Sequence, residues 1–146
     1  MIRLTPWLLS LVLLTGCSVG PGLIGPLPAA SDKDNAAKII VIRERAFIGS
    51  MQTLPVTLDG VRIYGLRVGE HTVMAVNPGD HIVGTQYPVT IPPSWEDVNV
   101  WVLTEPRRSY YFRLDLRGGL PLLNPIAPEV GSILMSQTTR ISPPPE

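Results

Sequence analysis

One residue of this 146-residue chain has a type and a setting that predict a definite chemistry, and it is Cys17. It is the only cysteine, so it cannot form a disulfide within the chain or a zinc site built from several thiolates. A lone free thiol is unusual in an oxidising compartment, and we therefore expect the sulfur to be consumed by a modification. Thr15 and Gly16 stand directly before it, and such small residues give a peptidase close access to the backbone.

The residues that precede Cys17 have the proportions of a secretion signal. Arg3 supplies a positive amino-terminal region, and a mostly apolar stretch runs from Leu4 to Leu13. About ten residues are too few to cross an apolar bilayer core of ~30 Å, which takes about 20 helical residues. The stretch suits the hydrophobic region of a signal peptide, so residues 1–16 are predicted to be one.

Leu14-Thr15-Gly16-Cys17 resembles the lipobox of bacterial prolipoproteins. The resemblance implies that a diacylglycerol is attached to the Cys17 sulfur, that the chain is cut just before it, and that membrane lipid is a partner. Two or three acyl chains give stable anchoring where one is marginal. Enterobacterial lipoproteins that are retained in the inner membrane carry aspartate directly after the cysteine. This chain has Ser18 there, so the resemblance favours the outer membrane, facing the periplasm. The alternatives are an ordinary secretory signal or a short buried helix with an incidental cysteine.

The other residues that could do chemistry form no catalytic or metal-binding pattern. His71 and His81, the only histidines, fall about five residue pairs apart on one predicted hairpin, or about 16 Å at ~3.3 Å per residue, too far to share a metal ion. Glu96 and Asp97 are adjacent, whereas glycosidase carboxylates sit across the scissile bond on separate elements. No Gly-x-Ser-x-Gly elbow or phosphate-cradling glycine motif occurs. We predict no catalytic residue, no metal and no cofactor.

Aromatic side chains are the remaining candidates for a binding surface. Tyr64, Trp95 and Tyr111, together with Trp101, could stack their flat faces on apolar patches of a sugar or a peptide. Tyr64 and Tyr111 fall on the outward faces of their predicted strands. The alternative is that these rings pack within the sheets and cover their edges.

Composition and charge indicate the kind of partner and the limits of the folded domain. Formal net charge is zero, and subtracting Arg3 from the 12 basic residues leaves 11 against 12 acidic ones. The absence of a basic patch argues against nucleic acid as a partner. Residues 17–36, with several Gly and Pro, are predicted to be a lipidated N-terminus and flexible tether, and residues 142–146 a disordered polyproline-like tail. The folded domain would span 37–141.

Within that domain the apolar residues recur with period two, which is typical of strands. The clearest element is a hairpin over 54–65, because Asp59-Gly60 favours a type I′ turn. A two-residue turn there places Val56 opposite Ile63 on an apolar face and leaves Tyr64 on the other face.

The remaining elements complete an all-β pattern. A second hairpin is predicted over 71–87 with Pro78-Gly79 as its turn, and a loop over 88–97. Further strands are predicted over 38–43, 98–104, 109–116 and 120–126, and a short helix over 128–135. Six to eight short strands indicate a small antiparallel β-sandwich or open barrel with one short C-terminal helix.

Several short motifs are shared with known envelope domains. They are a first strand ending in Arg43, Val-Thr-Leu-Asp-Gly at 56–60, Asn-Pro-Gly-Asp-His at 77–81, Ser-Tyr-Tyr-Phe-Arg at 109–113 and Pro-Glu-Val-Gly at 128–131. In these the chain from Ala37 to Met135 resembles the uncharacterised bacterial domain-of-unknown-function family 2846, and β-sandwich modules of the PEGA type. Residues 88–97 depart from the pattern as an insertion. The resemblance implies a fold and an envelope location, and no activity.

Three functions remain open at this point. The first is a non-enzymatic, lipid-anchored envelope protein whose β-domain binds a partner protein or an envelope polymer. The second is an enzyme acting on polysaccharide or peptidoglycan, and the third is a structural subunit of an envelope assembly. The first predicts an exposed apolar or aromatic patch, or an unpaired sheet edge able to accept a strand.

Overall fold

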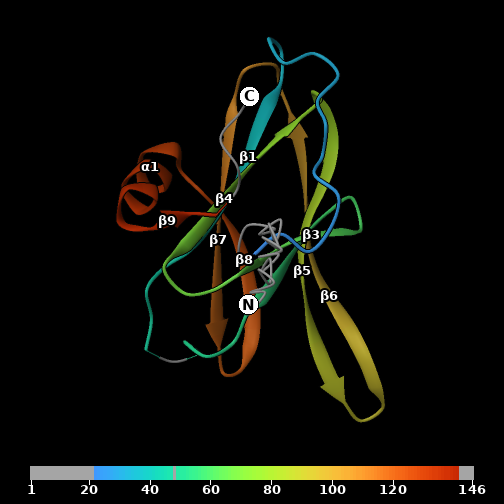
Figure 1. The fold of residues 1–146 in the computed structure, drawn as a ribbon, viewed down its shortest axis with the longest axis vertical. Helices are drawn as coiled ribbons and strands as arrows, with labels where there is room; N and C mark the ends of the chain where they lie inside the picture. Colours follow the sequence, from blue (N-terminus) through green and yellow to red (C-terminus); the bar gives the residue numbers. More distant parts are fainter. Residues whose placement is uncertain (1–21, 48, 142–146) are drawn as a thin grey trace, which may run out of the picture.

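The computed structural model of the protein describes residues 22–47 and 49–141 (Figure 1). The predicted signal peptide, including Leu14, Thr15 and Gly16, lies outside the described residues, as do Cys17 and the predicted tail at 142–146. The described part consists mostly of strands with one short helix, so the predicted all-β class is confirmed.

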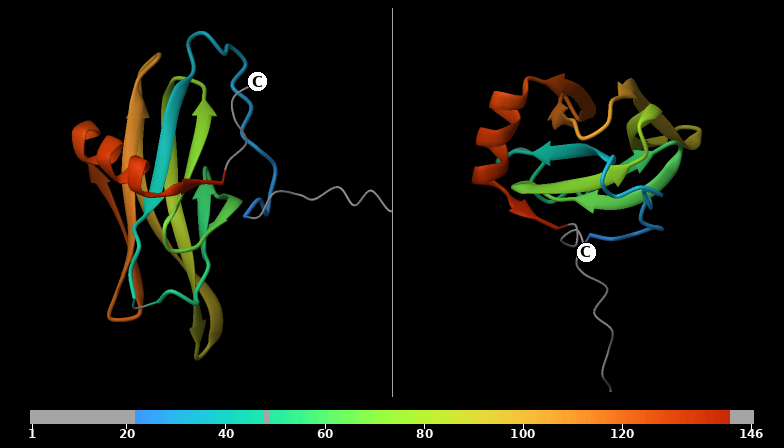
Figure 2. Two further views of the ribbon diagram at one scale, coloured as in Figure 1. Left: turned by 60° about the vertical axis from the view of Figure 1, so that its left-hand side comes forward. Right: turned by 90° about the horizontal axis from the view of Figure 1, so that it is seen from above.

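The nine strands in the described residues form two sheets packed face to face, and neither sheet closes into a barrel (Figure 2). One sheet has the order β8-β7-β1-β4-β9 and the other β3-β2-β5-β6. Most neighbours are antiparallel, but β1 pairs with β7, and β4 with β9, in parallel. The elements are β1 (Ala37–Arg43), β2 (Leu54–Leu58), β3 (Val61–Leu66), β4 (Glu70–Val76), β5 (Gly79–Thr90), β6 (Pro93–Thr104), β7 (Ser109–Arg117), β8 (Leu120–Ile126), α1 (Pro128–Gln137) and β9 (Thr139–Arg140).

Strand β1 is buried on both faces and forms the centre of the five-stranded sheet. Ile39 and Val41 join the apolar core between the sheets, where Phe112 and Leu114 of β7 also lie. Helix α1 packs against β1 and β7 and begins with Pro128, as predicted (Figure 2). Side chains on both faces of such a strand are kept from water, which explains the unbroken apolar run in β1.

The Asp59-Gly60 hairpin is confirmed, with Leu58 opposite Val61 as predicted, but its register shifts by one residue farther from the turn. Asp59 has φ 51° and Gly60 has φ 80°, as a type I′ turn requires. A β-bulge between Val56 and Thr57 then places Val56 opposite Tyr64, where a regular ladder would place Ile63. A shift of one residue moves a side chain to the other face of a sheet. Tyr64 is therefore in the core, with 1% of its surface exposed.

The second predicted hairpin is wrong, because its two arms lie in different sheets. Strand β4 pairs with β1, and β5 pairs with β2 and β6. The Pro78-Gly79 link therefore crosses from one sheet to the other. The Thr104 hydroxyl holds this crossing, accepting a hydrogen bond from the Gly79 N–H at 3.2 Å and lying 3.0 Å from the Gly79 carbonyl oxygen. Turn residues specify a local backbone shape, and they do not decide which strand a chain will pair with.

The predicted loop over 88–97 is also wrong. Strands β5 and β6 are twelve residues each and pair from Gly79↔Thr104 to Thr90↔Pro93, with a turn at the cis bond between Ile91 and Pro92. Prolines are tolerated there because β2 pairs with β5 only from Val83 to Thr85. Beyond that point no third strand of the described residues needs the missing N–H groups.

The part of the predicted tether from Gly22 onward lies against the domain. Leu23 forms a bridge with Tyr64, and the Gly65 N–H donates to the Gly22 carbonyl at 2.6 Å. A Cβ on Gly25 would stand 1.8 Å from the Arg62 carbonyl oxygen, so only glycine permits this approach. The segment between the domain and Cys17 is therefore only residues 18–21.

Arg43 fixes the loop that joins the two sheets after β1. Arg43 is 3% exposed, and its guanidinium donates to the carbonyl oxygens of Gln52, Leu66 and Gly49 at 2.6, 2.7 and 2.8 Å. Burial lowers the pKa of Arg43, while the carboxylates of Glu70 and Asp115 oppose this shift. One side chain thus positions the 44–53 loop against the end of β3.

Candidate functional site at the open edge of strand β6

Three of the four sheet edges are covered or blunted, at least in part, within the described residues. The two-residue β9 pairs with β4 at Glu70 and His71, and the segment from Gly22 to Gly25 lies along β3. Strand β8 carries Pro121 and Pro125, which have no N–H to offer. Strand β6 differs: it is twelve residues long, and none of the described segments pairs with its outer side.

Backbone geometry shows which groups of β6 face the open side. The Ile82 N–H donates to the Asp59 carboxylate, and the Ile82 carbonyl accepts from the Asp59 N–H, each at 2.8 Å. Both groups of Ile82 therefore point toward β2 and away from β6. Ile82 is opposite Trp101, so this pair is not hydrogen-bonded across β5 and β6. The N–H and C=O of Trp101, and by alternation those of Asn99 and Leu103, point outward.

The outer stretch of β6 lacks the usual protection against pairing. Natural edge strands are commonly blunted by charged side chains, prolines or bulges. Residues 98–104 contain no charge and no proline, and β5 pairs with β6 without a register shift. This stretch can accept another strand.

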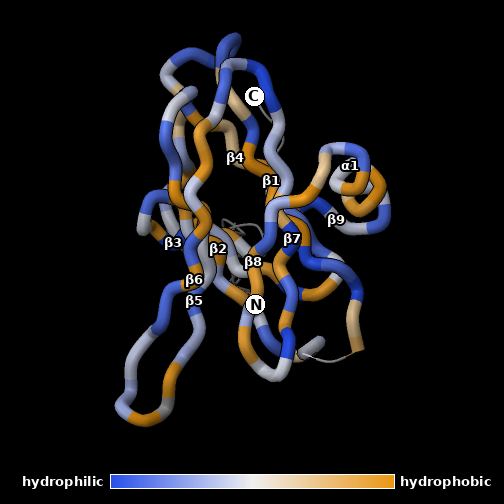
Figure 3. The backbone as a smooth tube through the Cα atoms, turned by 180° about the vertical axis from the view of Figure 1, so that it is seen from behind, coloured by the Kyte–Doolittle hydropathy of each residue, from blue (hydrophilic) through white to orange (hydrophobic). Residues whose placement is uncertain are grey.

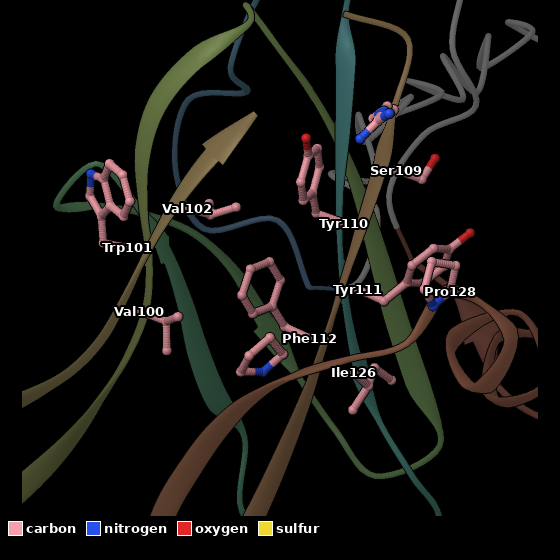
Figure 4. A pocket seen from close by; sticks show the side chains of 11 residues that line it. Val100, Trp101, Val102, Ser109, Tyr110, Tyr111, Phe112, Ile126 and Pro128 are labelled. Atoms are coloured by element: carbon pink, nitrogen blue, oxygen red, sulfur yellow. The ribbon is translucent and has the colours of Figure 1, made fainter. Parts of the chain in front are cut away.

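An apolar groove runs beside this edge, between β6 of one sheet and β7 and β8 of the other (Figure 4). It encloses about 540 Å³. Val100 and Val102 approach it from one side, and Phe112 and Tyr110 from the other (Figure 4). The Tyr110 hydroxyl accepts a hydrogen bond from the Glu105 N–H at 2.8 Å, which holds the ring at the groove's end. The full lining is Val100, Trp101, Val102, Arg108, Ser109, Tyr110, Tyr111, Phe112, Pro125, Ile126 and Pro128.

Apolar side chains also mark the outer face of β6. Trp101 is 64% exposed and Leu103 55%, and Ile82 lies opposite Trp101 on β5. Large exposed aromatic side chains beside a groove are typical of binding surfaces. A strand added to β6 would place alternate side chains in the groove and over Trp101.

The three aromatic residues predicted from the sequence do not form one surface. Tyr64 is in the core, and Tyr111 is half-buried under α1, where a Cβ on Gly131 would stand 2.3 Å from its ring. Trp95 is exposed near the far end of β6, with the Arg62 guanidinium carbon 4.2 Å from its ring centre. Trp101 is the aromatic residue that lies at both the groove and the open edge, and only the sheet order reveals this.

The predicted acidic pair also lies on β6. Glu96 and Asp97 are neighbours on a strand, so their side chains point to opposite faces. Asp97 accepts a hydrogen bond from the Gln86 amide at 2.5 Å, and Gln86 in turn accepts from Arg62. This row of polar side chains lies on the outer face near Trp95.

The two histidines lie in different sheets and have separate hydrogen-bond partners. His71 is buried and bonds the Thr138 hydroxyl at 2.8 Å. His81 bonds the Asp59 carboxylate at 2.8 Å and the Asn77 carbonyl at 2.7 Å. Among the residues that the structure describes, no three His, Cys, Asp or Glu side chains are grouped to hold a metal ion.

The histidines predict opposite effects of pH on stability. Burial acts to lower the pKa of His81, but the hydrogen bonds to Asn77 and Asp59 and the charges of Asp59 and Asp80 outweigh it, so the pKa is raised above 6.5. The contribution of His81 to the free energy of unfolding is therefore full below pH 6.5 and is lost as pH rises through its raised pKa. Burial, with the charge of Arg140, lowers the pKa of His71, whose contribution is full above 6.5 and is lost as pH falls.

We therefore expect a His81→Asn variant to lose the decline in unfolding free energy above pH 6.5 and to keep the acid-side decline. The effect will be at most about 1 kcal/mol, since Asp59 is half-exposed. Urea unfolding between pH 5 and pH 9 measures the free energy of unfolding. His71→Asn is the matched variant, and it should lose the decline at acid pH instead. An unchanged alkaline decline in His81→Asn would contradict the assignment.

Comparison with known proteins adds no relative. No family model, no curated protein and no solved structure matches this chain. None of the helices in the described residues is long and apolar enough to cross a membrane.

Proposed function

We propose that this protein is a non-enzymatic bacterial lipoprotein, anchored through Cys17 in the outer membrane and facing the periplasm, whose β-sandwich binds a partner polypeptide by strand addition at β6. The observation that carries the binding proposal is the unpaired, uncharged edge at 98–104 beside an apolar groove. Strand addition gives affinity through main-chain hydrogen bonds and specificity through pockets for alternate side chains. The lipid anchor rests on the lipobox resemblance of residues 14–17, and kinship with family 2846 stays a prediction.

A second candidate ligand is an envelope polymer, favoured by the outer face of β5 and β6. Trp95 and Trp101 are exposed on this face, six residues apart and therefore about 20 Å from each other. Gln86 and Asp97 lie beside Trp95. Aromatic rings with planar polar groups suit a glycan chain, but such binding would use side chains and would not need the open backbone.

The two candidates are separated by substituting one edge position in two ways. Asn99→Pro removes an outward N–H and places a ring in the path of an incoming strand, without removing a β5–β6 hydrogen bond. Asn99→Ala removes the side chain and keeps the N–H. We expect a photo-reactive residue at Leu103 to cross-link a partner protein in intact cells. The yield should fall at least tenfold in Asn99→Pro and stay within twofold in Asn99→Ala.

The outcomes are distinct. Equal losses of cross-link yield in Asn99→Pro and Asn99→Ala would contradict strand addition and favour a ligand recognised by side chains. An adduct of twice the chain's mass would favour the structural-subunit alternative. Absence of any adduct from Leu103 would contradict a polypeptide partner at this edge. Circular dichroism of each variant controls for folding.

A further inference from the structure

The hairpin of β5 and β6 extends beyond the rest of its sheet. Strand β2 pairs with β5 only as far as Thr85, so the hairpin tip, residues 88–95, projects from the body (Figures 1 and 2). The tip reads Pro-Val-Thr-Ile-Pro-Pro-Ser-Trp and contains no charged residue. Ile91 is 88% exposed at its end, and Trp95 is half-exposed at its base. In Figure 3 the end of the hairpin shows short orange, hydrophobic segments between pale ones.

Two other connections at the same end of the sandwich also expose apolar side chains (Figures 1 and 2). Phe47 and Met51 of the 44–53 loop are 98% and 96% exposed, and Leu120 follows the Gly118-Gly119 turn between β7 and β8. A single exposed apolar residue is ordinary, but four from three connections at one end indicate a surface that is covered in use.

Exposed charges of both signs lie near these connections, because Glu96 and Asp97 follow Trp95 on β6 and basic residues lie on the other two connections. Arg45 and Arg117 are exposed on the 44–53 loop and at the end of β7. The nearby carboxylates of Glu44 and Asp115 are both paired with Arg113, at 3.2 and 2.8 Å. Exposed cations beside protruding apolar side chains match phosphate headgroups above an acyl layer.

The position of the N-terminal segment identifies the partner. Gly22 bonds to Gly65, the neighbour of Leu66, and Leu66 pairs with Leu54 directly after the 44–53 loop. Cys17 precedes Gly22 by five residues, and five residues span at most about 18 Å. A lipid on Cys17 therefore holds this part of the domain close to the membrane surface.

We propose that the hairpin tip and the 44–53 loop form a lipid-binding end that inserts into the interface of a phospholipid bilayer. This inference rests on the lipid anchor of the proposed function. Trp95 lies two residues from Pro93, or about 7 Å along β6, and Ile91 lies beyond Pro93 in the turn. An apolar element lying in the interface sinks about 5–10 Å. Ile91 enters the acyl boundary while Trp95 lies at headgroup level, where tryptophan is enriched.

The test uses fluorescence of Trp95 in the mature lipoprotein on vesicles of phosphatidylethanolamine and phosphatidylglycerol. Trp7 is lost with the signal, so Trp101→Phe leaves Trp95 as the single tryptophan. We expect brominated lipids to quench its emission strongly, and Ile91→Asp to reduce this quenching at least threefold. The control is Val61→Asp, an apolar position that is 44% exposed beside the Asp59-Gly60 turn, away from the hairpin tip, and it should leave quenching unchanged.

A second form of the chain separates this inference from the anchor. Residues 17–146 with Cys17→Ser lack the lipid, and we expect this form to bind the same vesicles weakly and at least tenfold more weakly still with Ile91→Asp. Acylated protein whose Trp95 is not quenched would overturn the lipid-binding end and leave the anchor intact. Protein that is never acylated, but whose Cys17→Ser form shows quenching, would overturn the anchor alone. Quenching that is equal in Ile91→Asp and Val61→Asp would overturn the role of the tip.

Discussion

An Arg43→Met variant will lose about 3 to 5 kcal/mol of unfolding free energy, a large share of what a domain of this size has. The substitution keeps an apolar stem of similar length and removes the guanidinium. The Leu66 carbonyl oxygen then loses its donor in the buried interior, and the carbonyl oxygens of Gly49 and Gln52 lose theirs in a part-buried setting. Each buried polar group left unsatisfied costs about 1–3 kcal/mol. Urea unfolding of the mature-length chain with Cys17→Ser measures the difference.

Arg113→Met is the matched control for that substitution. Arg113 is also an arginine with close partners, but they are ion pairs with the carboxylates of Glu44 and Asp115 near the surface, and its side chain is 42% exposed. Such pairs contribute up to about 1 kcal/mol. Equal losses in the two variants would show that Arg43 is not a special support of the 44–53 loop. Retained stability in Arg43→Met would contradict the account of the loop directly.

A Cys17→Ala variant will lose its membrane attachment almost completely. If the Cys17 sulfur carries a diacylglycerol, the variant has no site for it, and processing before residue 17 should stop. We expect the protein to accumulate as an uncleaved precursor without glycerolipid, seen by mass spectrometry and by its release from membranes in alkaline carbonate. Ser18→Ala is the control, because it keeps the thiol and should be acylated and retained. Unchanged processing and retention in Cys17→Ala would refute the anchor.

The parts of the fold that follow from local rules were predictable from the sequence. The Asp59-Gly60 turn needs two residues with positive φ, and few other dipeptides satisfy it. Strand β7 has a strict alternation that places Phe112 and Leu114 in the core. Pro128 begins a helix because its fixed φ and missing N–H suit the first turn.

The parts that depend on non-local pairing were not predictable. A bulge beside Val56 moves Tyr64 from the predicted outer face to the core, and no residue in that hairpin signals it. Pro78-Gly79 has the chemistry of a hairpin turn, yet the chain leaves the sheet there, because β4 pairs with β1. Prolines at 88–93 suggest a loop only if neighbouring strands need their N–H groups, and none of the described strands does.

The same limit applies to the candidate site. Which strand is an edge depends on the order of all the strands, so the open side of β6 could not be read from residues 93–104 alone. Trp101 could be recognised as an aromatic candidate, but its place at the edge and the groove required the packing of β7 and β8. The glycines at 22 and 25 are typical of a flexible tether, but in the structure they allow the chain to approach β3 closely.

The central proposal is that this sandwich works at a membrane surface to which its own N-terminus is attached. The most direct measurement is the mass of the N-terminal peptide of the native protein, purified from the membranes of its host without added tags. The account predicts a peptide that begins at residue 17 and carries a diacylglycerol on the sulfur. A peptide that begins at Met1 and contains an unmodified thiol would contradict it.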